Sequence, residues 1–238
     1  MQDCAVADGF PDFLSRLFRL SPRPAPAEMP GHTTHRPTAL HRKDLKMKRF
    51  VLATALLVLA APLAFAQTST WKSDTAHSEV GFAIKHMGIS TVHGRFGKVD
   101  ATLVYNEADI TKSTVTAAIG IDTVNTGETA RDNHLKTDSF FDIAKFPTAT
   151  FVSTSVVRDG SSLKVTGNFT LHGVTKPVVL VVEGPATPVV SPMDHKTHSG
   201  FEATTTISRT AFGIGSSFPA AILGDDVKLT IELEVVKQ

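Results

Sequence analysis

The sequence predicts an all-β fold with one short helix inserted near residues 127–137. Apolar residues alternate with polar ones at a period of two through much of residues 67–238, as in strands with one buried face. Several of these stretches are joined by short turns rich in glycine and polar residues, which connect antiparallel neighbours. Strands of this kind build either a sandwich or an up-and-down barrel.

The alternation is clearest in residues 227–235, where aliphatic residues alternate with Lys, Thr and Glu. A short turn at 158–161 separates two other stretches, and His172-Gly173 separates the next pair. Both turns indicate antiparallel neighbours. In chain order, the eight predicted strands are 79–85, 99–105, 115–121, 148–157, 163–171, 174–183, 201–207 and 227–235.

The predicted helix begins near a capping signal. Asn125 offers an N-cap with Glu128 three residues further on, which is a capping-box arrangement. Residues 128–137 contain neither proline nor glycine, and we expect the helix to end before Asp138. Residues 185–199 read PATPVVSPMDHKTHS and predict a long polar loop.

We expect the first 66 residues to lie outside the folded domain. Residues 47–66 combine a basic start, an apolar run and an Ala-Phe-Ala site, which predicts a secretory signal peptide cleaved after Ala66. Residues 1–46 are rich in proline and have no sustained period, so they predict a disordered leader or a start assigned too early. Residues 67–238 are then one domain, periplasmic and not membrane-spanning once processed.

Composition excludes several classes of function. Acidic residues slightly outnumber basic ones in residues 67–238, and this balance argues against nucleic acid as a partner. The single cysteine, Cys4, lies in the leader, so the mature chain has neither a disulfide nor a thiol nucleophile. Export without cysteine favours a periplasmic protein over a disulfide-stapled extracellular module.

Arg131, Asp132 and His134 are the strongest candidates for chemistry. They could orient a substrate or an anionic head group, or they could satisfy caps and loop carbonyls at a barrel rim. We favour the capping role for Asp132 and leave both roles open for Arg131. His195 and His198 have ligand-like spacing, but their polar loop favours chance. No nucleophile elbow or P-loop occurs, and the histidine spacing favours chance, so we predict no catalytic residue, no metal and no cofactor.

Several motifs follow one another along residues 70–238. The longest reads RDNHLKTDSFFDIAKFPTATF at 131–151 and contains four phenylalanines. The first reads WKSDTAHSEVGFAIKH at 71–86. The others are VHGRF at 92–96, GNFTLHGVTKP at 167–177, RTAFG at 209–213 and GDDV at 224–227.

This ordered series resembles the YceI-like family of exported, lipocalin-like polyisoprenoid-binding proteins. The resemblance implies an eight-stranded antiparallel up-and-down barrel of lipocalin-like type. Its lumen would hold a long isoprenoid chain, polyprenyl or quinone-like, for transport, storage or sequestration in the periplasm. The resemblance brings no catalytic residues. Dimers are known in the family, which leaves a homodimer open.

We expect the apolar residues that alternate along the strands to line the lumen. Phe140 and Phe141 would close one end of it, and Arg131 or Arg209 would contact the polar head of the lipid. Two rival functions stay open. One is an enzyme acting on a small hydrophobic or lipid substrate at residues 131–134, and the other is a stress-response interaction protein with no ligand. The residues expected to contact the ligand are Phe82, Ile84, Leu103, Ile119, Ile121, Arg131, His134, Phe140, Phe141, Phe151, Phe169, Phe201, Arg209 and Ile231.

Overall fold

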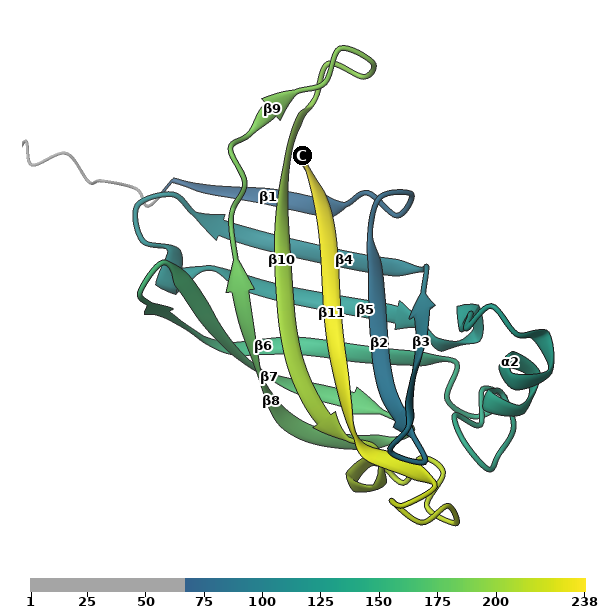
Figure 1. The fold of residues 1–238 in the computed structure, drawn as a ribbon. Coiled ribbons are helices and arrows are strands. Elements are labelled where there is room, and N and C mark those ends of the chain that lie inside the picture. The colour runs from purple at the N-terminus through teal and green to yellow at the C-terminus, as the bar shows by residue number, and fades with distance from the viewer. Residues whose placement is uncertain (1–66) are drawn as a thin grey trace, which may run out of the picture. The chain divides into compact units, whose positions relative to one another are not determined.

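The computed structural model describes residues 67–238, in which eight antiparallel strands close into a barrel (Figure 1). Closure pairs the two edges that an open sheet would expose. The long pairing of β10 with β11 contributes to this closure. In ring order the strands are β1 (Thr68–Ser73), β4 (Val99–Asn106), β5 (Thr114–Gly120), β6 (Thr148–Asp159), β7 (Ser162–Leu171), β8 (Val174–Glu183), β10 (Thr197–Ser208) and β11 (Leu223–Lys237).

Strand β11 has two partners on one side. Its C-terminal end pairs with β1, where Trp71 lies opposite Lys237. Its earlier part pairs with β2 (Glu79–His86), and β3 (Ser90–Phe96) pairs with the outer edge of β2. The β2–β3 hairpin therefore continues the wall beyond the end of β1, as Figure 1 shows beside the lower part of β11.

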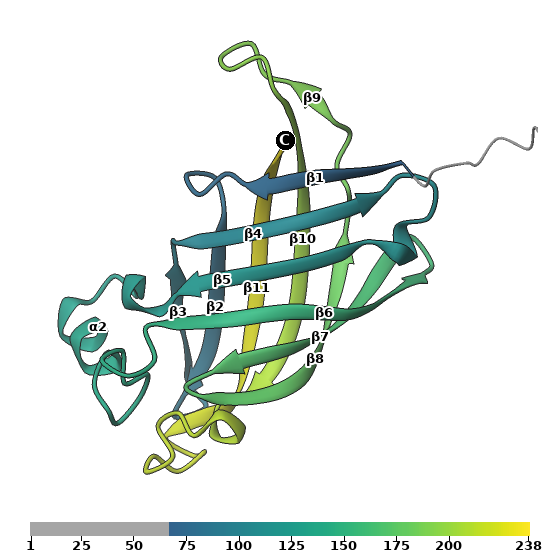
Figure 2. The same ribbon diagram turned by 180° about the vertical axis from the view of Figure 1, so that it is seen from behind.

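The strand register places apolar side chains on one face across neighbouring strands. Phe151 on β6 lies opposite Ala117 on β5 and Phe169 on β7. Both phenylalanines are buried, and Figure 2 shows β4, β5, β6 and β7 running side by side along this wall. Burying each such side chain contributes about 1.5–3 kcal/mol to folding, so the inward phase of these strands stabilises the barrel.

All eight predicted stretches overlap strands, but the ring differs from them in one member. Strand β1 was not predicted, yet it belongs to the ring, whereas the predicted stretch at 79–85 forms β2, which lies outside the ring. The reason is that an inward position of β1 is the polar residue Ser69, which accepts a hydrogen bond from Trp71 Nε1 at 2.9 Å. That polar position removes the apolar alternation from β1.

The predicted polar loop at 185–199 is partly wrong. Residues in its middle form the short strand β9 (Val189–Val190), which pairs with the first residues of β10. Strand β10 therefore begins at Thr197, inside the predicted loop. The polar residues there obscured the strand, because His198 and Ser199 replace the apolar side chains expected of a strand.

The helix begins further along the chain than predicted and has a different N-cap residue. α2 spans Thr129–Leu135, and Glu128 is its N-cap, accepting a hydrogen bond from the Ala130 N–H. Asn125 is not the cap because its backbone bonds to Arg95 in an isolated β-bridge. Within residues 67–238, three 3₁₀ turns accompany α2: η1 (Ile110–Lys112), η2 (Ile121–Thr123) and η3 (Thr210–Phe212).

The predicted leader at 1–46 and the predicted signal peptide at 47–66 lie outside the described residues. Within residues 67–238, none of the helices is long and apolar enough to cross a membrane.

Candidate functional site

The barrel encloses two apolar cavities. The larger has a volume of about 460 Å³ and the smaller about 150 Å³. Val80, Ile119, Phe169 and Leu229 line both, so the two cavities adjoin inside the lumen. Small-molecule sites in proteins are typically apolar hollows of roughly 300–1,000 Å³, and the larger cavity falls within that range.

The rim of the larger cavity includes the β2–β3 turn. His86, Ser90 and Ile222 line the cavity. Beside them Ile89 is 81% exposed and Met87 is 51% exposed, and the Met87 N–H donates to the Ile222 carbonyl at 2.8 Å. Apolar side chains of the turn are therefore presented to solvent next to the cavity entrance.

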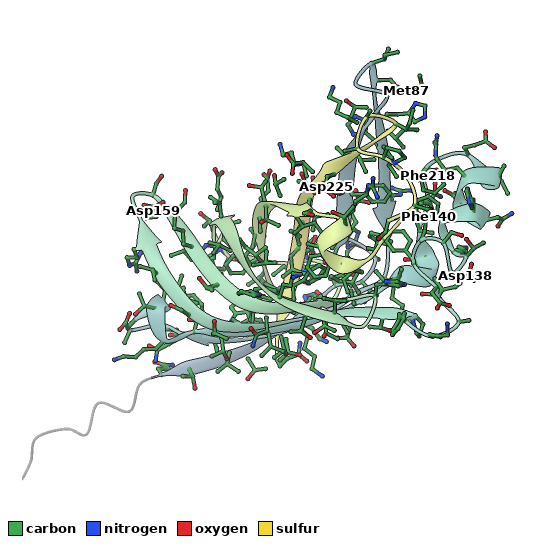
Figure 3. The ribbon with its side chains drawn as sticks, turned by 90° about the horizontal axis from the view of Figure 1, so that it is seen from below. Met87, Asp138, Phe140, Asp159, Phe218 and Asp225 are labelled. Atoms are coloured by element: carbon green, nitrogen blue, oxygen red, sulfur yellow. The ribbon has the colours of Figure 1, made fainter. Side chains whose placement is uncertain are left out.

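Aromatic rings gather between this hairpin and the segment around α2. Phe140 and Phe218 are stacked with ring centroids 5.2 Å apart. The imidazole of His134 meets Phe140 edge-on at 5.0 Å. Figure 3 shows Phe218 and Phe140 between the hairpin tip at Met87 and the segment at Asp138. Phe140 is buried and Phe218 is half-buried, so these rings form one wall of the larger cavity.

Arg131, Asp132 and Thr126 form a clasp at the start of α2. The Thr126 hydroxyl donates to Asp132 Oδ1 at 2.6 Å, and the Thr126 N–H donates to the same oxygen at 2.8 Å. Arg131 Nε donates to the Thr126 hydroxyl at 2.8 Å, and its Nη2 donates to the Thr126 carbonyl at 3.0 Å. Asp132 therefore acts as a cap for the loop. Arg131, which is held by its two bonds to Thr126, also lines the larger cavity.

Arg209 is the organising residue of the loop that follows β10. It is 3% exposed, and all five of its N–H groups have backbone carbonyls as acceptors. A guanidinium fully engaged in this way has no donor left for a head group. The acceptors are the carbonyls of Gly224 at 2.9 Å, Ile214 at 3.0 Å, Phe218 at 2.7 Å, Leu223 at 2.8 Å and Gly215.

The residues named in advance as ligand contacts all lie on cavity walls, although contact with a ligand itself stays a prediction. These residues form two groups, one for each cavity, and Ile119 and Phe169 belong to both groups. The larger cavity has Phe82, Ile84, Ile121, Arg131, His134, Phe140, Phe141 and Arg209, whereas the smaller has Leu103, Phe151, Phe201 and Ile231.

Several other lining residues were not among the predicted ligand contacts. Val227 and Leu229 share the inward phase of Ile231, so the same alternation was sufficient to find them. Phe96 ends the VHGRF motif, and its ring packs 5.4 Å from Phe82. Phe218 lies in an irregular loop, where no period in the sequence indicates which way a side chain points.

Similarity to known proteins is consistent with this geometry. A sequence model described as the YceI-like domain matches residues 71–235. Protein YceI of Salmonella arizonae is 36% identical over 196 residues, which cover 81% of this chain and 100% of that protein.

Solved structures share the fold. A Campylobacter jejuni YceI protein is 34% identical with a TM-score of 0.58, covering 65% of this chain and 90% of that one. Burkholderia cenocepacia BcnA gives a TM-score of 0.60 at 23% identity, covering 68% of this chain and 98% of that one. A polyisoprenoid binding domain from Saccharophagus degradans gives 0.51 at 16%, covering 71% and 98%. The last two similarities concern the fold alone. With the domain match and the Salmonella relative, the chain belongs to the YceI-like family.

Proposed function

We propose that this protein is a carrier that holds the apolar chain of an isoprenoid lipid inside its barrel. The observation that carries the proposal is the pair of adjoining apolar cavities, of which only the larger has arginine and histidine side chains on its lining. A long apolar chain with one polar end matches this distribution. The similar fold of the Saccharophagus domain, described as polyisoprenoid-binding, supports the choice of ligand class.

The binding energy needs no catalytic group. Each CH₂ moved from water into an apolar lumen contributes roughly 0.8 kcal/mol. Ordering the flexible chain and losing its translational freedom offset part of this gain. Several isoprene units are therefore enough for stable binding, and longer chains should bind more tightly until both cavities are full.

Arg131 is the residue we assign to the polar head. It lies on the rim and lines the larger cavity, and its two bonds to Thr126 leave part of the guanidinium unengaged by that residue. Arg209 instead shapes the mouth, since its donors are consumed by carbonyls. His134 and Phe218 would pack against the first isoprene units below the head.

The location of this activity follows from the predicted signal peptide at 47–66, which would deliver the barrel to the periplasm. A lipid with a long apolar chain is insoluble in that aqueous space. A barrel that covers the chain would allow the lipid to be moved, stored or kept apart from other reactions.

The clasp at α2 argues against the rival enzyme. A general base must face the substrate with its acceptor free, whereas Asp132 Oδ1 accepts two hydrogen bonds from Thr126. The adjoining cavities likewise argue against a barrel whose core is filled by its own side chains.

Organic extraction followed by mass spectrometry tests the proposal. Protein purified from its periplasm should release an isoprenoid lipid, and stripped protein should take up a polyprenyl lipid in equal molar amount.

The variant Ile119→Trp should block uptake because Ile119 lines both cavities. Val152→Trp, on the exposed face of β6, is the matched control. Overfilling a core costs about 1–3 kcal/mol, so thermal melts must confirm that both variants fold. A stripped wild-type barrel that takes up no polyprenyl lipid would refute the proposal.

A further inference from the structure

A second group of polar side chains lies where β1 turns into β2. His77 Nδ1 is 3.1 Å from Asp74 Oδ2 and 4.0 Å from Glu234 Oε2. One ligand atom from each of these three residues lies within 4.8 Å of the other two. They come from a turn and from the distant strand β11, so the fold, and not the local sequence, brings them together.

The backbone holds these groups in place. The Asp74 N–H donates to the Glu234 carbonyl at 2.8 Å. Ser78, which is buried, donates through its hydroxyl to the same carbonyl at 3.2 Å and accepts from the Glu234 N–H at 3.1 Å. Asp74 Oδ1 accepts from the Ala76 N–H at 2.9 Å, which leaves Oδ2 directed to His77. The turn and β11 are thus fixed relative to each other before any ligand arrives.

A further histidine supports the far side of Glu234. His198 Nδ1 is 2.7 Å from Glu234 Oε1, the oxygen that does not approach His77. His198 Nε2 is in turn 3.1 Å from Asp194 Oδ2. Partners of this kind orient a metal-binding carboxylate and hold its other oxygen free. His195 does not belong to this group, since it is exposed on the neighbouring loop.

The donor set has the chemistry of a transition-metal site. One imidazole nitrogen and two carboxylate oxygens suit Zn²⁺ and its neighbours, whereas Ca²⁺ and Mg²⁺ prefer oxygen ligands alone. Bonds of about 2.0–2.2 Å in a tetrahedron place ligand atoms about 3.3–3.6 Å apart. The separations at His77 bracket that spacing. Small side-chain movements would therefore bring the three atoms onto one ion.

We propose that Asp74, His77 and Glu234 bind a divalent transition-metal ion of the Zn²⁺ class, with His198 positioning Glu234. The ion would connect the β1–β2 turn to β11 beside the short pairing of Trp71–Ser73 with Val235–Lys237. Metal binding at this position would therefore stabilise the seam at which the ring closes. The proposal is independent of the lipid carried in the lumen.

Calorimetric titration of the mature protein, first stripped with a chelator, tests the site. ZnCl₂ should bind with one ion per chain and raise the melting temperature, whereas CaCl₂ should do neither. His77→Ala and Glu234→Gln should each weaken Zn²⁺ binding at least tenfold and abolish the rise in melting temperature. His198→Ala should weaken it by a smaller factor, because His198 acts through Glu234. His195→Ala, which removes an exposed histidine outside the group, should leave binding unchanged.

Two results would overturn the site. One is the absence of one-to-one Zn²⁺ binding by the wild-type chain. The other is wild-type affinity in His77→Ala, which would assign the ion to another position. Circular dichroism establishes folding of each variant. If Glu234→Gln does not fold, Asp74→Asn supplies the second ligand variant and must lose the same tenfold for the proposal to stand.

Discussion

The ring of Phe151 on β6 occupies the space where residue 167 on β7 would carry a side chain. Residue 167 is glycine, and a Cβ built there would overlap the Phe151 ring and lie 2.7 Å from the Val152 carbonyl oxygen. The absence of a side chain on Gly167 therefore leaves room for the Phe151 ring, which lines the smaller cavity.

Gly167→Ala should destabilise the barrel, because the added methyl must displace either the ring or the neighbouring backbone. Overpacking of this kind costs about 1–3 kcal/mol. Urea denaturation measures the change in the free energy of unfolding. Gly81→Ala is the matched control on β2, since its Cβ would meet its nearest neighbour, the Thr230 carbonyl oxygen, at an ordinary 3.6 Å. Equal stability of the two variants would contradict the proposed role of the glycine.

Phe169→Ala separates a ligand-holding barrel from a filled one. Phe169 lines both cavities and is buried. Its removal should cost about 3–5 kcal/mol of stability through lost burial and an enlarged cavity. For a carrier, the truncation should also speed release of a bound polyprenyl lipid, measured by transfer to acceptor vesicles. A loss of stability with unchanged lipid retention would favour the interaction-protein reading.

Arg131→Ala tests the assignment of the polar head. Hydrogen bonds to charged groups contribute about 1.5–3 kcal/mol, so this variant should bind a polyprenyl phosphate about tenfold or more weakly than wild type. Binding of the uncharged polyprenol should change far less. Arg158→Ala removes an exposed arginine of β6 that does not line either cavity, and it serves as the control. Equal loss for both lipids would mean that Arg131 acts through the α2 clasp and not on the head.

His134→Ala distinguishes the carrier from the rival enzyme. His134 packs edge-on against Phe140 and Phe218, so it contributes surface to the larger cavity. We expect the variant to retain polyprenyl lipid with an affinity within a few-fold of wild type. Mass spectrometry of lipid incubated with each protein should find the lipid chemically unchanged in both. Conversion of the lipid by wild type, lost in the variant, would establish the enzyme instead.

The strands could be predicted because burial on one face imposes a period of two on the chain. That signal failed where an inward position is polar, as at Ser69 in β1. It also gave no information on ring closure, which depends on β11 pairing with β1. That pairing joins segments far apart in the chain.

The site could be predicted in part for the same reason. Inward phase identified Leu103 and Ile231, which line the smaller cavity. The roles of the two arginines could not be read from the sequence, because they depend on which acceptors the fold supplies. Arg209 meets the carbonyls of an irregular loop, and no pattern of residue types encodes where those carbonyls point.

Arg209→Lys should destabilise the loop between η3 and β11. A lysine has three donors on a flexible stem and cannot reproduce the planar fork that reaches five carbonyls. Leaving buried carbonyls without partners costs about 1–3 kcal/mol each where water cannot reach them. We expect a loss of about 3 kcal/mol or more in urea denaturation, together with faster proteolysis of residues 210–222. Arg131→Lys, at the more exposed clasp, should cost less than 1 kcal/mol, roughly the worth of one exposed hydrogen bond.

Asp225 should give the barrel part of its resistance to acid. The Ser208 hydroxyl, followed by the hydroxyl and N–H of Thr210, holds the pKa of Asp225 below its ordinary value of 3.8. A carboxyl whose pKa is lower in the folded state stabilises the fold above its ordinary pKa, and this contribution disappears as the pH falls through the folded value.

Asp225→Asn should therefore be less stable than wild type at pH 7. The difference should shrink below about pH 4, because protonation then removes the same interaction from wild type. Thermal melts of both proteins between about pH 2.5 and about pH 7 measure this difference, and a gap that stays constant across the range would contradict the assignment to Asp225.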